Sequence, residues 1–253
     1  MAIDEAILNA RVQGLAPNTV RFYRWHPSAV SIGKFQKIEN EVYVENCKKH
    51  GVDVVRRISG GGTVYHDAEG EMTYSVVVSK EDLNADSIAE AYTKIYAGVV
   101  EALKFLGLNA DFKEGDTRAC PNLTVNGKKI SGSAQCHRSG VVLQHGTLLV
   151  DVDLEKMFTF LKVQWAKSCM EVVNVAKNKI TSINAELKTA VTIEKVYQAL
   201  VCGFQKALKR QLADGELTTF EKELAKTLYI EKYATENWNI HGKDLTSTGQ
   251  IIG

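Results

Sequence analysis

Residues 56–67 have the sequence RRISGGGTVYHD, in which a strand-like segment ends on two arginines and three glycines follow. Because glycine has no Cβ, Gly60, Gly61 and Gly62 allow backbone N–H groups to converge and a ligand to approach the chain closely. Arg57, beside such a turn, suits a phosphate or a carboxylate. A plain flexible hairpin is the alternative, but three glycines destabilise a turn entropically, so we favour an anion site. No Gly-Lys-Ser/Thr follows, so the segment is not a Walker loop.

A second motif, KKISGSAQ at 128–135, follows an Asn-Gly pair at 126–127. Asn-Gly between apolar runs is the strongest short signal of a hairpin, because a type I′ turn needs positive φ at both central residues. In the strand that follows, Lys128 and Lys129 point to opposite faces, so one of them can turn into a cleft. The small residues 131–134 would leave room for a ligand above the sheet. Taken alone, a solvated lysine pair is the more common explanation of this pattern.

Two single residues are ambiguous from their local pattern. Cys120 lies beside Arg118 in RACPN (118–122), and a neighbouring cation can lower the pKa of a thiol and make it nucleophilic. No base is identifiable beside it, so the pattern alone favours an ordinary loop cysteine. His145 lies in QHGTLL (144–149), where a lone histidine is more often a satisfied structural group than a catalyst.

The order of the expected elements predicts an α+β fold without regular βαβ alternation. The expected strands are 19–24, 29–32, 52–57, 71–78 and 141–150, with the first two paired; the expected helices are 3–12, 39–50, 88–106 and most of the chain from 154. Ser87 and Glu90 match a capping box at the start of the third of these helices. The last residues, 246–253 (TSTGQIIG), show no pattern and are expected to form a disordered tail.

The composition is that of an ordinary globular protein. Hydrophobic residues make up 45% and charged residues 24% of the 253 residues, which excludes a disordered or fibrous chain. The formal net charge is +1, so we expect no nucleic-acid or membrane partner from the overall field, and no apolar run approaches the ~18 residues of a membrane span. The five cysteines are scattered and contain no C-x-x-C, which favours a reduced, cytoplasmic compartment over a disulfide framework or a zinc site.

Together these segments resemble the lipoate–protein ligase and octanoyltransferase family, which is related to biotin–protein ligase. The resemblance rests on RFYRWHPSAVSIGKFQ (21–36), RRISGGGTVYHD (56–67), NGKKISGSAQ (126–135), LQHGTLLV (143–150) and KYATENWN (232–239). It implies an α+β fold, a biotin/lipoyl protein ligase-like mixed sheet surrounded by helices, forming one catalytic domain over 1–245. Either this domain starts abruptly at residue 1 or an N-terminal segment is missing.

The resemblance also implies a site. The residues that it assigns to acyl-adenylate binding are Arg57, Ser59, Gly60, Gly61, Gly62, Thr63, Val64, Tyr65, His66, Gly132 and His145. Lys129 matches the catalytic lysine that contacts the acyl carbonyl and the α-phosphate. A ligase would use ATP and Mg²⁺ to convert lipoic acid to lipoyl-AMP, and Lys129 would stabilise the developing charge. Where ligases carry a metal-binding aspartate this chain has Asn122, and Cys-dependent octanoyltransferases carry a cysteine in the loop that holds Cys120.

The sequence leaves three functions open. The main interpretation, favoured by the all-glycine turn, is an ATP-dependent lipoate–protein ligase that acts alone or with a separate accessory subunit. The alternative is an ATP-independent octanoyl or lipoyl transferase that acts through a Cys120 thioester. A further alternative is a non-catalytic relative that binds lipoyl-AMP or lipoyl domains. The expected acceptors are lipoyl domains of 2-oxoacid dehydrogenase E2 subunits or the glycine-cleavage H protein.

Overall fold

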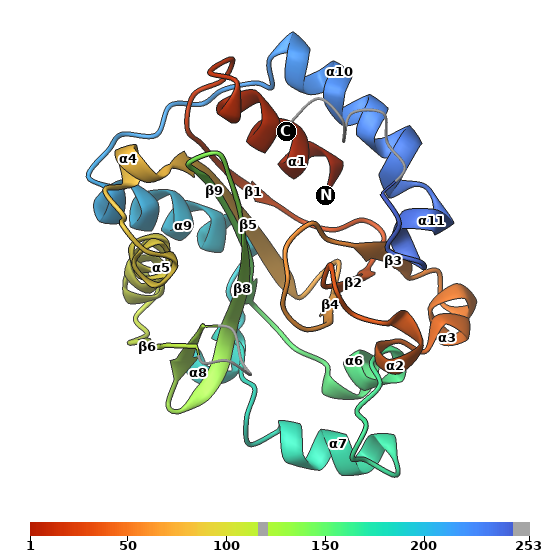
Figure 1. Cartoon of the computed structure of the whole chain (residues 1–253). Coiled ribbons are helices and arrows are strands. Elements are labelled where there is room, and N and C mark those ends of the chain that lie inside the picture. Colours follow the sequence, from red (N-terminus) through yellow and green to blue (C-terminus); the bar gives the residue numbers. More distant parts are fainter. Residues whose placement is uncertain (116–120, 245–253) are drawn as a thin grey trace.

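The computed structural model of the chain describes residues 1–115 and 121–244 (Figure 1). Its strands are β1 (Thr19–Tyr23), β2 (Ala29–Ile32), β3 (Asp53–Arg56), β4 (Val64–His66), β5 (Glu71–Ser79), β6 (Asp111–Lys113), β7 (Asn122–Val125), β8 (Lys128–Arg138) and β9 (Val141–Leu149). They form a six-stranded antiparallel sheet in the order β1-β5-β9-β8-β7-β6 and a three-stranded sheet in the order β3-β2-β4. In the smaller sheet β2 and β3 run parallel, and β2 and β4 run antiparallel. The expected combination of mixed strands and surrounding helices is confirmed.

The helices surround both sheets (Figure 1). They are α1 (Ala2–Val12), α2 (Ile38–Glu41), α3 (Val44–Lys49), α4 (Lys80–Leu83), α5 (Ile88–Phe105), α6 (Leu154–Phe160), α7 (Cys169–Ala176), α8 (Ile183–Leu187), α9 (Ile193–Leu208), α10 (Thr219–Leu228), a single π-helical turn η1 (Tyr229–Tyr233) and α11 (Glu236–Asn239). Helices α5 and α9 pack on one face of the larger sheet, whereas α1 packs on the other face beneath α10. None of the described helices is both long and apolar enough to cross a membrane.

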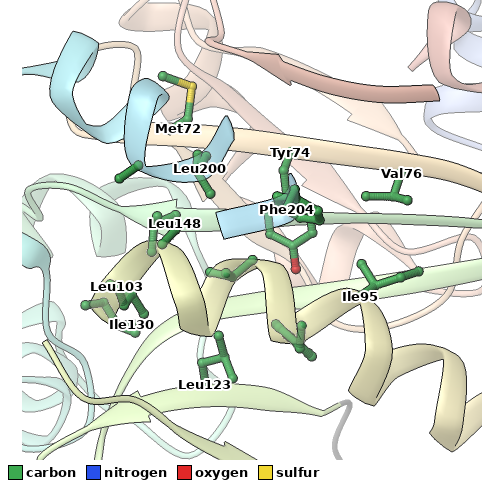
Figure 2. Packing of buried hydrophobic residues seen from close by; sticks show 14 of the residues in the cluster. Met72, Tyr74, Val76, Ile95, Leu103, Leu123, Ile130, Leu148, Leu200 and Phe204 are labelled. Carbon is green, nitrogen blue, oxygen red and sulfur yellow. The ribbon is translucent and has the colours of Figure 1, made fainter. Parts of the chain in front are cut away.

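Strand β5 is buried on both faces because its side chains alternate between two clusters. As expected, Met72, Tyr74 and Val76 share one face, where they meet α5 and α9 (Figure 2). Val77 faces the opposite cluster, which includes α1. Phe204 of α9 packs between the rings of Tyr74 and the partly buried Phe22 of β1, with ring centroids 5.8 and 5.5 Å away. Full burial of such a side chain stabilises the fold by roughly 1.5–3 kcal/mol, so this core fixes the sheet that carries the site.

Arg56 ties the smaller sheet to the end of the described chain. Its side chain is 2% exposed, and its Nε donates to the carbonyl oxygen of Trp238 at 2.9 Å. Its Nη2 donates to the carbonyl oxygen of Ile240 at 3.1 Å. In return, Trp238 Nε1 donates to the carbonyl oxygen of Arg56 at 2.9 Å. The first of the two arginines in the glycine motif therefore has a structural role, since it connects β3 to α11 and the residue after it.

Several local predictions are confirmed in detail. Asn126 and Gly127 have φ values of 49° and 76°, the two positive angles that the predicted turn requires. Ser87 caps α5 by accepting a hydrogen bond from the Glu90 backbone N–H. The Glu90 carboxylate, however, accepts from the backbone N–H of Asp86 at 2.8 Å, so the reciprocal bond of a capping box goes to the preceding residue.

Two expectations about the first fifty residues are wrong. The strands at 19–24 and 29–32 do not pair with each other, because β1 pairs with β5 and β2 pairs with β3 and β4. The helix expected over 39–50 is divided into α2 and α3. At the break, Val42 is buried in an extended conformation and forms a bridge with Leu161, a tertiary contact that outweighs helix continuation. The tail expected at 246–253 lies outside the described residues.

Candidate active site

A cavity of about 990 Å³ is lined by residues of both sheets and of the first two turns of α5. Ten residues expected at the site line it, namely Arg57, Gly61, Gly62, Thr63, Val64, His66, Asn122, Lys129, Gly132 and His145. Three expected residues, Ser59, Gly60 and Tyr65, are not among the lining residues. The structure thus brings together motifs that lie more than eighty residues apart in the sequence.

Tyr65 points away from the cavity into the core of the smaller sheet. Its ring stacks on Phe160 with centroids 5.1 Å apart, and its hydroxyl donates to Asp67 Oδ2 at 3.1 Å. Because successive side chains of a strand alternate, the neighbours Val64 and His66 face the cavity instead. Tyr65 therefore helps to hold β4 in place through the hydrophobic core and does not contact the cavity.

Arg57 holds the glycine turn from the inside. Its Nη2 donates to the carbonyl oxygens of Gly60 and Gly62, both at 2.9 Å. Its Nη1 donates to the carbonyl oxygen and to Oγ of Ser31, at 3.0 and 2.9 Å, and its Nε lies 3.4 Å from Ser59 Oγ. Arg57 is only 5% exposed, so these contacts fix the shape of the turn. A role in binding an anion stays a prediction.

His145 connects the glycine segment to helix α1. Its Nε2 lies 2.6 Å from Ser59 Oγ, and its Nδ1 lies 3.2 Å from Asp4 Oδ2. Burial would raise the pKa of Asp4, but the charge of Arg21, 3.4 Å from Oδ1, and the hydrogen bond with His145 hold this pKa well below its usual value. Burial lowers the pKa of His145. The neutral ring therefore donates from Nδ1 to Asp4 and accepts at Nε2 from the Ser59 hydroxyl.

His66 has the same arrangement on the other side of the arginine. Its Nε2 lies 2.7 Å from Ser31 Oγ, and its Nδ1 lies 2.7 Å from Glu71 Oε1. Trp25 stacks on the imidazole ring with centroids 4.2 Å apart, and its Nε1 donates to Thr73 Oγ1 at 2.9 Å. Thr73 in turn donates to Glu71 Oε1 at 2.6 Å. Each histidine thus links a buried carboxylate to a serine that contacts the guanidinium group.

The three glycines of the turn have different roles. Gly61 has a φ of 89°, and its carbonyl oxygen lies only 2.1 Å from where a Cβ on Gly33 would stand. The turn can therefore approach Gly33 only because Gly33 has no Cβ, while Gly61 adopts a φ that favours glycine. A Cβ on Gly60 or Gly62 would meet no atom within 4 Å. Packing does not require glycine at these two positions, and the open side at Gly62 leaves room for a ligand in the cavity.

Lys129 lines the cavity and Lys128 does not, as strand alternation predicts. A Cβ on Gly132 would stand 2.8 Å from Lys129 Nζ, so the absence of a side chain at this position makes room for the ammonium group. The backbone of Lys129 is fixed by the segment before α8: its N–H donates to the carbonyl oxygen of Lys179 at 2.8 Å and its carbonyl oxygen accepts from Thr181 at 2.9 Å. The catalytic role of this lysine stays a prediction.

Cys120 lies outside the described residues. The next residue, Pro121, lines the cavity, as does Asn122 at the start of β7. Asn122 presents an amide where the resemblance to ligases implies a carboxylate. Among the residues that the structure describes, no group of three or more His, Cys, Asp or Glu could hold a metal ion. The amide oxygen of Asn122 lacks the charge of a carboxylate, which makes it a weaker ligand for Mg²⁺.

The sequence analysis missed both carboxylates of the histidine networks and the aromatic wall formed by Tyr23 and Trp25. Asp4 lies on a short amphipathic helix and is 1% exposed; an acidic residue at the start of a helix is ordinary, so its pattern gives no warning. Glu71 is also 1% exposed. The available signal was its position, because an acidic residue at the start of the apolar strand at 71–78 has to be paired when it is buried.

The profile of the lipoyl protein ligase A/B catalytic domain family matches residues 1–205 of the chain. The chain belongs to this family. A relative from Halalkalibacterium halodurans named octanoyltransferase LipM is 38% identical and covers 94% of this chain and 93% of its own length. Relatives with the same name from Clostridioides difficile (36% identical, 94% of this chain and 93% of the relative) and Bacillus subtilis (34%, 94% and 92%) are similar over the same extent.

Solved structures of family members have the same fold. The bipartite lipoate protein ligase of Thermoplasma acidophilum, determined in a study with its E2 lipoyl domain, superimposes with a TM-score of 0.84 at 32% identity, over 97% of this chain and 92% of that one. A lipoate–protein ligase A bound with ATP superimposes with a TM-score of 0.82 at 33% identity, over 96% and 93%. The biotin/lipoyl protein ligase-like architecture expected from the sequence is confirmed.

The main functional interpretation from the sequence, an ATP-dependent lipoate–protein ligase, is corrected by these relatives. The three relatives above match nearly the whole chain and are all named octanoyltransferases. The all-glycine turn misled the sequence analysis. Gly61 has a φ of 89°, which favours glycine, but a Cβ on Gly60 or Gly62 would meet no atom within 4 Å. Three consecutive glycines at this turn therefore do not identify the acyl donor.

Proposed function

We propose that this protein transfers an octanoyl group from an acyl carrier protein to a lysine of a lipoyl domain, without ATP, through a thioester on Cys120. The observation that carries the proposal is the name octanoyltransferase, which is shared by relatives that are 34–38% identical to this chain. The match extends over at least 92% of the length of each relative. A thioester donor is already activated for acyl transfer, so the ATP and Mg²⁺ expected for a ligase have no part in this reaction.

The proposed reaction has two steps. In the first, the Cys120 sulfur attacks the thioester carbonyl, an S–C bond to the enzyme forms, and the S–C bond to the carrier breaks; the cysteine proton ends on the carrier thiol. In the second, the neutral ε-amine of the acceptor lysine attacks the carbonyl of the enzyme thioester, a C–N amide bond forms, and the S–C bond to Cys120 breaks; the proton that the amine loses restores the cysteine thiol. The enzyme thioester divides one difficult transfer into two easier steps.

The other cysteines are poor candidates for this thioester. Of the four in the described residues, Cys47, Cys136, Cys169 and Cys202, none lines the cavity. Burial raises the pKa of the Cys47 thiol to about 11 and also raises that of Cys136, which disfavours the reactive thiolate. Cys120 precedes the cavity-lining Pro121 directly in the chain. A reducing compartment such as the cytoplasm would keep this thiol available.

Lys129 is proposed to stabilise the oxyanion that develops on the acyl carbonyl in both steps. It lines the cavity together with Pro121 and Asn122. Lys129 is exposed in the structure, and a positive charge aimed at the position where negative charge develops lowers the barrier of such a transfer. The glycine turn, held by Arg57, would shape the opposite wall.

The proposed acceptors are lipoyl domains of 2-oxoacid dehydrogenase E2 subunits or the glycine-cleavage H protein. Support comes from the Thermoplasma acidophilum ligase, whose structure was determined in a study with its E2 lipoyl domain.

The test is a two-substrate assay followed by intact-protein mass spectrometry. The chain is incubated with octanoyl-acyl carrier protein and an apo lipoyl domain without ATP, and both the enzyme and the acceptor are weighed. We expect an octanoylated acceptor, and an acyl-enzyme adduct when the acceptor is left out. Cys120→Ala should abolish both, whereas Cys202→Ala, which alters an exposed cysteine on α9, should retain both. Transfer that survives Cys120→Ala, or that never occurs from the carrier, contradicts the proposal.

A further inference from the structure

The turn between β2 and α2 exposes a large aromatic side chain. Phe35 has 84% of its surface exposed, whereas the next most exposed large hydrophobic residue in the described part of the chain, Tyr229, has 60%. One exposed apolar residue is not unusual on a protein surface. The surroundings of Phe35, however, set it apart from the others.

The turn that carries Phe35 is held rigidly. Arg56 Nη1 donates to the carbonyl oxygens of Gly33, Lys34 and Gln36 at 3.1, 3.1 and 2.7 Å. The Lys34 N–H donates to the carbonyl oxygen of Ser59 at 2.9 Å. A buried guanidinium group thus fixes a surface turn whose tip is an exposed aromatic ring. Because the backbone of this turn is already fixed, an aromatic residue at its tip loses less conformational entropy on binding, which suits an interface anchor.

A basic groove of about 400 Å³ lies beside this ring. Lys34, Lys37 and Lys243 line it and are exposed, and Glu39 is its one acidic residue. This local excess of positive charge contrasts with the nearly neutral whole chain, whose formal net charge is +1. Gln36 lines both the groove and the acyl cavity, so the groove adjoins the site.

We propose that Lys34, Phe35, Lys37 and Lys243, the Phe35 patch, form the docking surface for the acidic carrier protein that donates the acyl thioester. The proposal rests on the proposed function. Its partner is identified by charge complementarity, since acyl carrier proteins are strongly acidic, and by the ring, which requires an apolar pocket in the partner.

The donor fits this position better than the acceptor does. The patch lies at the α2 side of the molecule, whereas β6, the edge strand of the larger sheet, lies on the opposite side (Figure 1), and Glu114, which follows β6, also lines the cavity. A carrier protein presents its acyl group on a long flexible pantetheine arm, which can extend past Gln36 into the cavity. An acceptor lysine is attached directly to its domain and has to dock close to the reacting thioester.

The decisive comparison uses two donors with the same thioester. Octanoyl-acyl carrier protein carries the docking surface, whereas octanoyl-pantetheine has the thioester and the arm but no protein. We expect Phe35→Ser and the double variant Lys34→Glu/Lys37→Glu to lower kcat/KM for octanoyl-carrier by at least about tenfold, with octanoyl-pantetheine unchanged. Phe105→Ser is the matched control, because Phe105 is 55% exposed and has Lys206 Nζ 5.7 Å from its ring, the same distance as between Lys34 Nζ and Phe35.

Binding is measured separately from turnover, so that a failed docking site and a failed function are distinguished. Fluorescence anisotropy of labelled carrier protein, titrated with the full chain, should show weaker binding for both patch variants and, for the unaltered chain, weakening with added salt. If the unaltered chain binds the carrier through the patch but transfers nothing from it, the proposed function fails and the docking surface stands. Equal losses with octanoyl-pantetheine, no loss with the carrier, or a loss only in kcat/KM for the lipoyl domain would each overturn the assignment.

Discussion

Ser59 Oγ and His145 Nε2 lie 2.6 Å apart, although 86 residues separate them in the chain. The bond joins the glycine segment to β9, and both side chains are at most 5% exposed. Asp4 accepts a hydrogen bond from the other ring nitrogen, Nδ1. This fixes the tautomer of His145, so Nε2 accepts a hydrogen bond from the Ser59 hydroxyl. The cavity wall therefore depends on a hydrogen bond whose direction is set by a residue of α1.

Ser59→Ala is expected to destabilise the protein by about 1–3 kcal/mol, because it leaves the buried Nε2 of His145 without its hydrogen bond. His145→Leu should cost a similar amount, and the double variant less than the sum, with a coupling of about 0.5–3 kcal/mol. Urea unfolding of the four proteins measures this cycle. Thr192→Ala, which removes the cap of α9, should be additive with His145→Leu. Additivity within the Ser59 pair would show that the bond does not contribute to stability.

Stability should fall as the pH is lowered from 7.5 to 5.5, partly because of His145. Burial lowers the pKa of this imidazole in the folded protein, while the unfolded chain titrates near the ordinary value of about 6.5. Below that value the unfolded state binds a proton that the folded state does not, so the free energy of unfolding decreases. His145→Gln should reduce this slope, as measured by urea unfolding at both pH values. An unchanged slope would mean that the imidazole is not held neutral.

Gly33→Ala and Gly62→Ala should separate packing from ligand access. A Cβ on Gly33 would stand 2.1 Å from the carbonyl oxygen of Gly61, a backbone atom, so we expect a loss of stability of about 1–3 kcal/mol. A Cβ on Gly62 would meet no atom within 4 Å, so stability should change by less than about 0.5 kcal/mol. Octanoyl transfer by Gly62→Ala should nevertheless fall roughly 10- to 100-fold, because the methyl group would displace the acyl donor in the cavity.

The control for Gly62→Ala is Gly215→Ala, which also meets no atom within 4 Å but lies outside the cavity. Thermal unfolding and initial transfer rates of the three variants provide the comparison. If Gly62→Ala is as active as Gly215→Ala, the acyl donor does not approach the turn.

The parts of the fold that were predictable from the sequence are those determined locally. The turn at Asn126 and Gly127 needs only the φ preferences of two residues, and the face shared by the side chains of β5 needs only a period of two. The pairing of strands could not be predicted in this way, because the alternating side chains of β1 are compatible with pairing to β2 as well as to β5. The contact between Asp4 and His145 spans 141 residues. Both ends look ordinary in the sequence, and only the packing of α1 on the larger sheet brings them together.

Lys129 and Lys128 provide the sharpest test of the site, since they are adjacent and chemically identical. Only Lys129 lines the cavity, where the missing side chain of Gly132 leaves room for its ammonium group. Loss of a charged donor at a developing oxyanion typically costs ~10²–10³ in rate, so Lys129→Ala should lose at least that much octanoyl transfer. Lys129→Arg should also fail, because a planar guanidinium group cannot replace a compact ammonium group in this space. Lys128→Ala should stay within about 0.5 kcal/mol of the unaltered protein in stability and close to it in rate. Single-turnover formation of the acyl-enzyme, followed by mass spectrometry, measures the first step directly. Equal and mild effects at the two positions would show that the cavity-facing lysine does not act on the acyl carbonyl, and that the oxyanion is stabilised by another group.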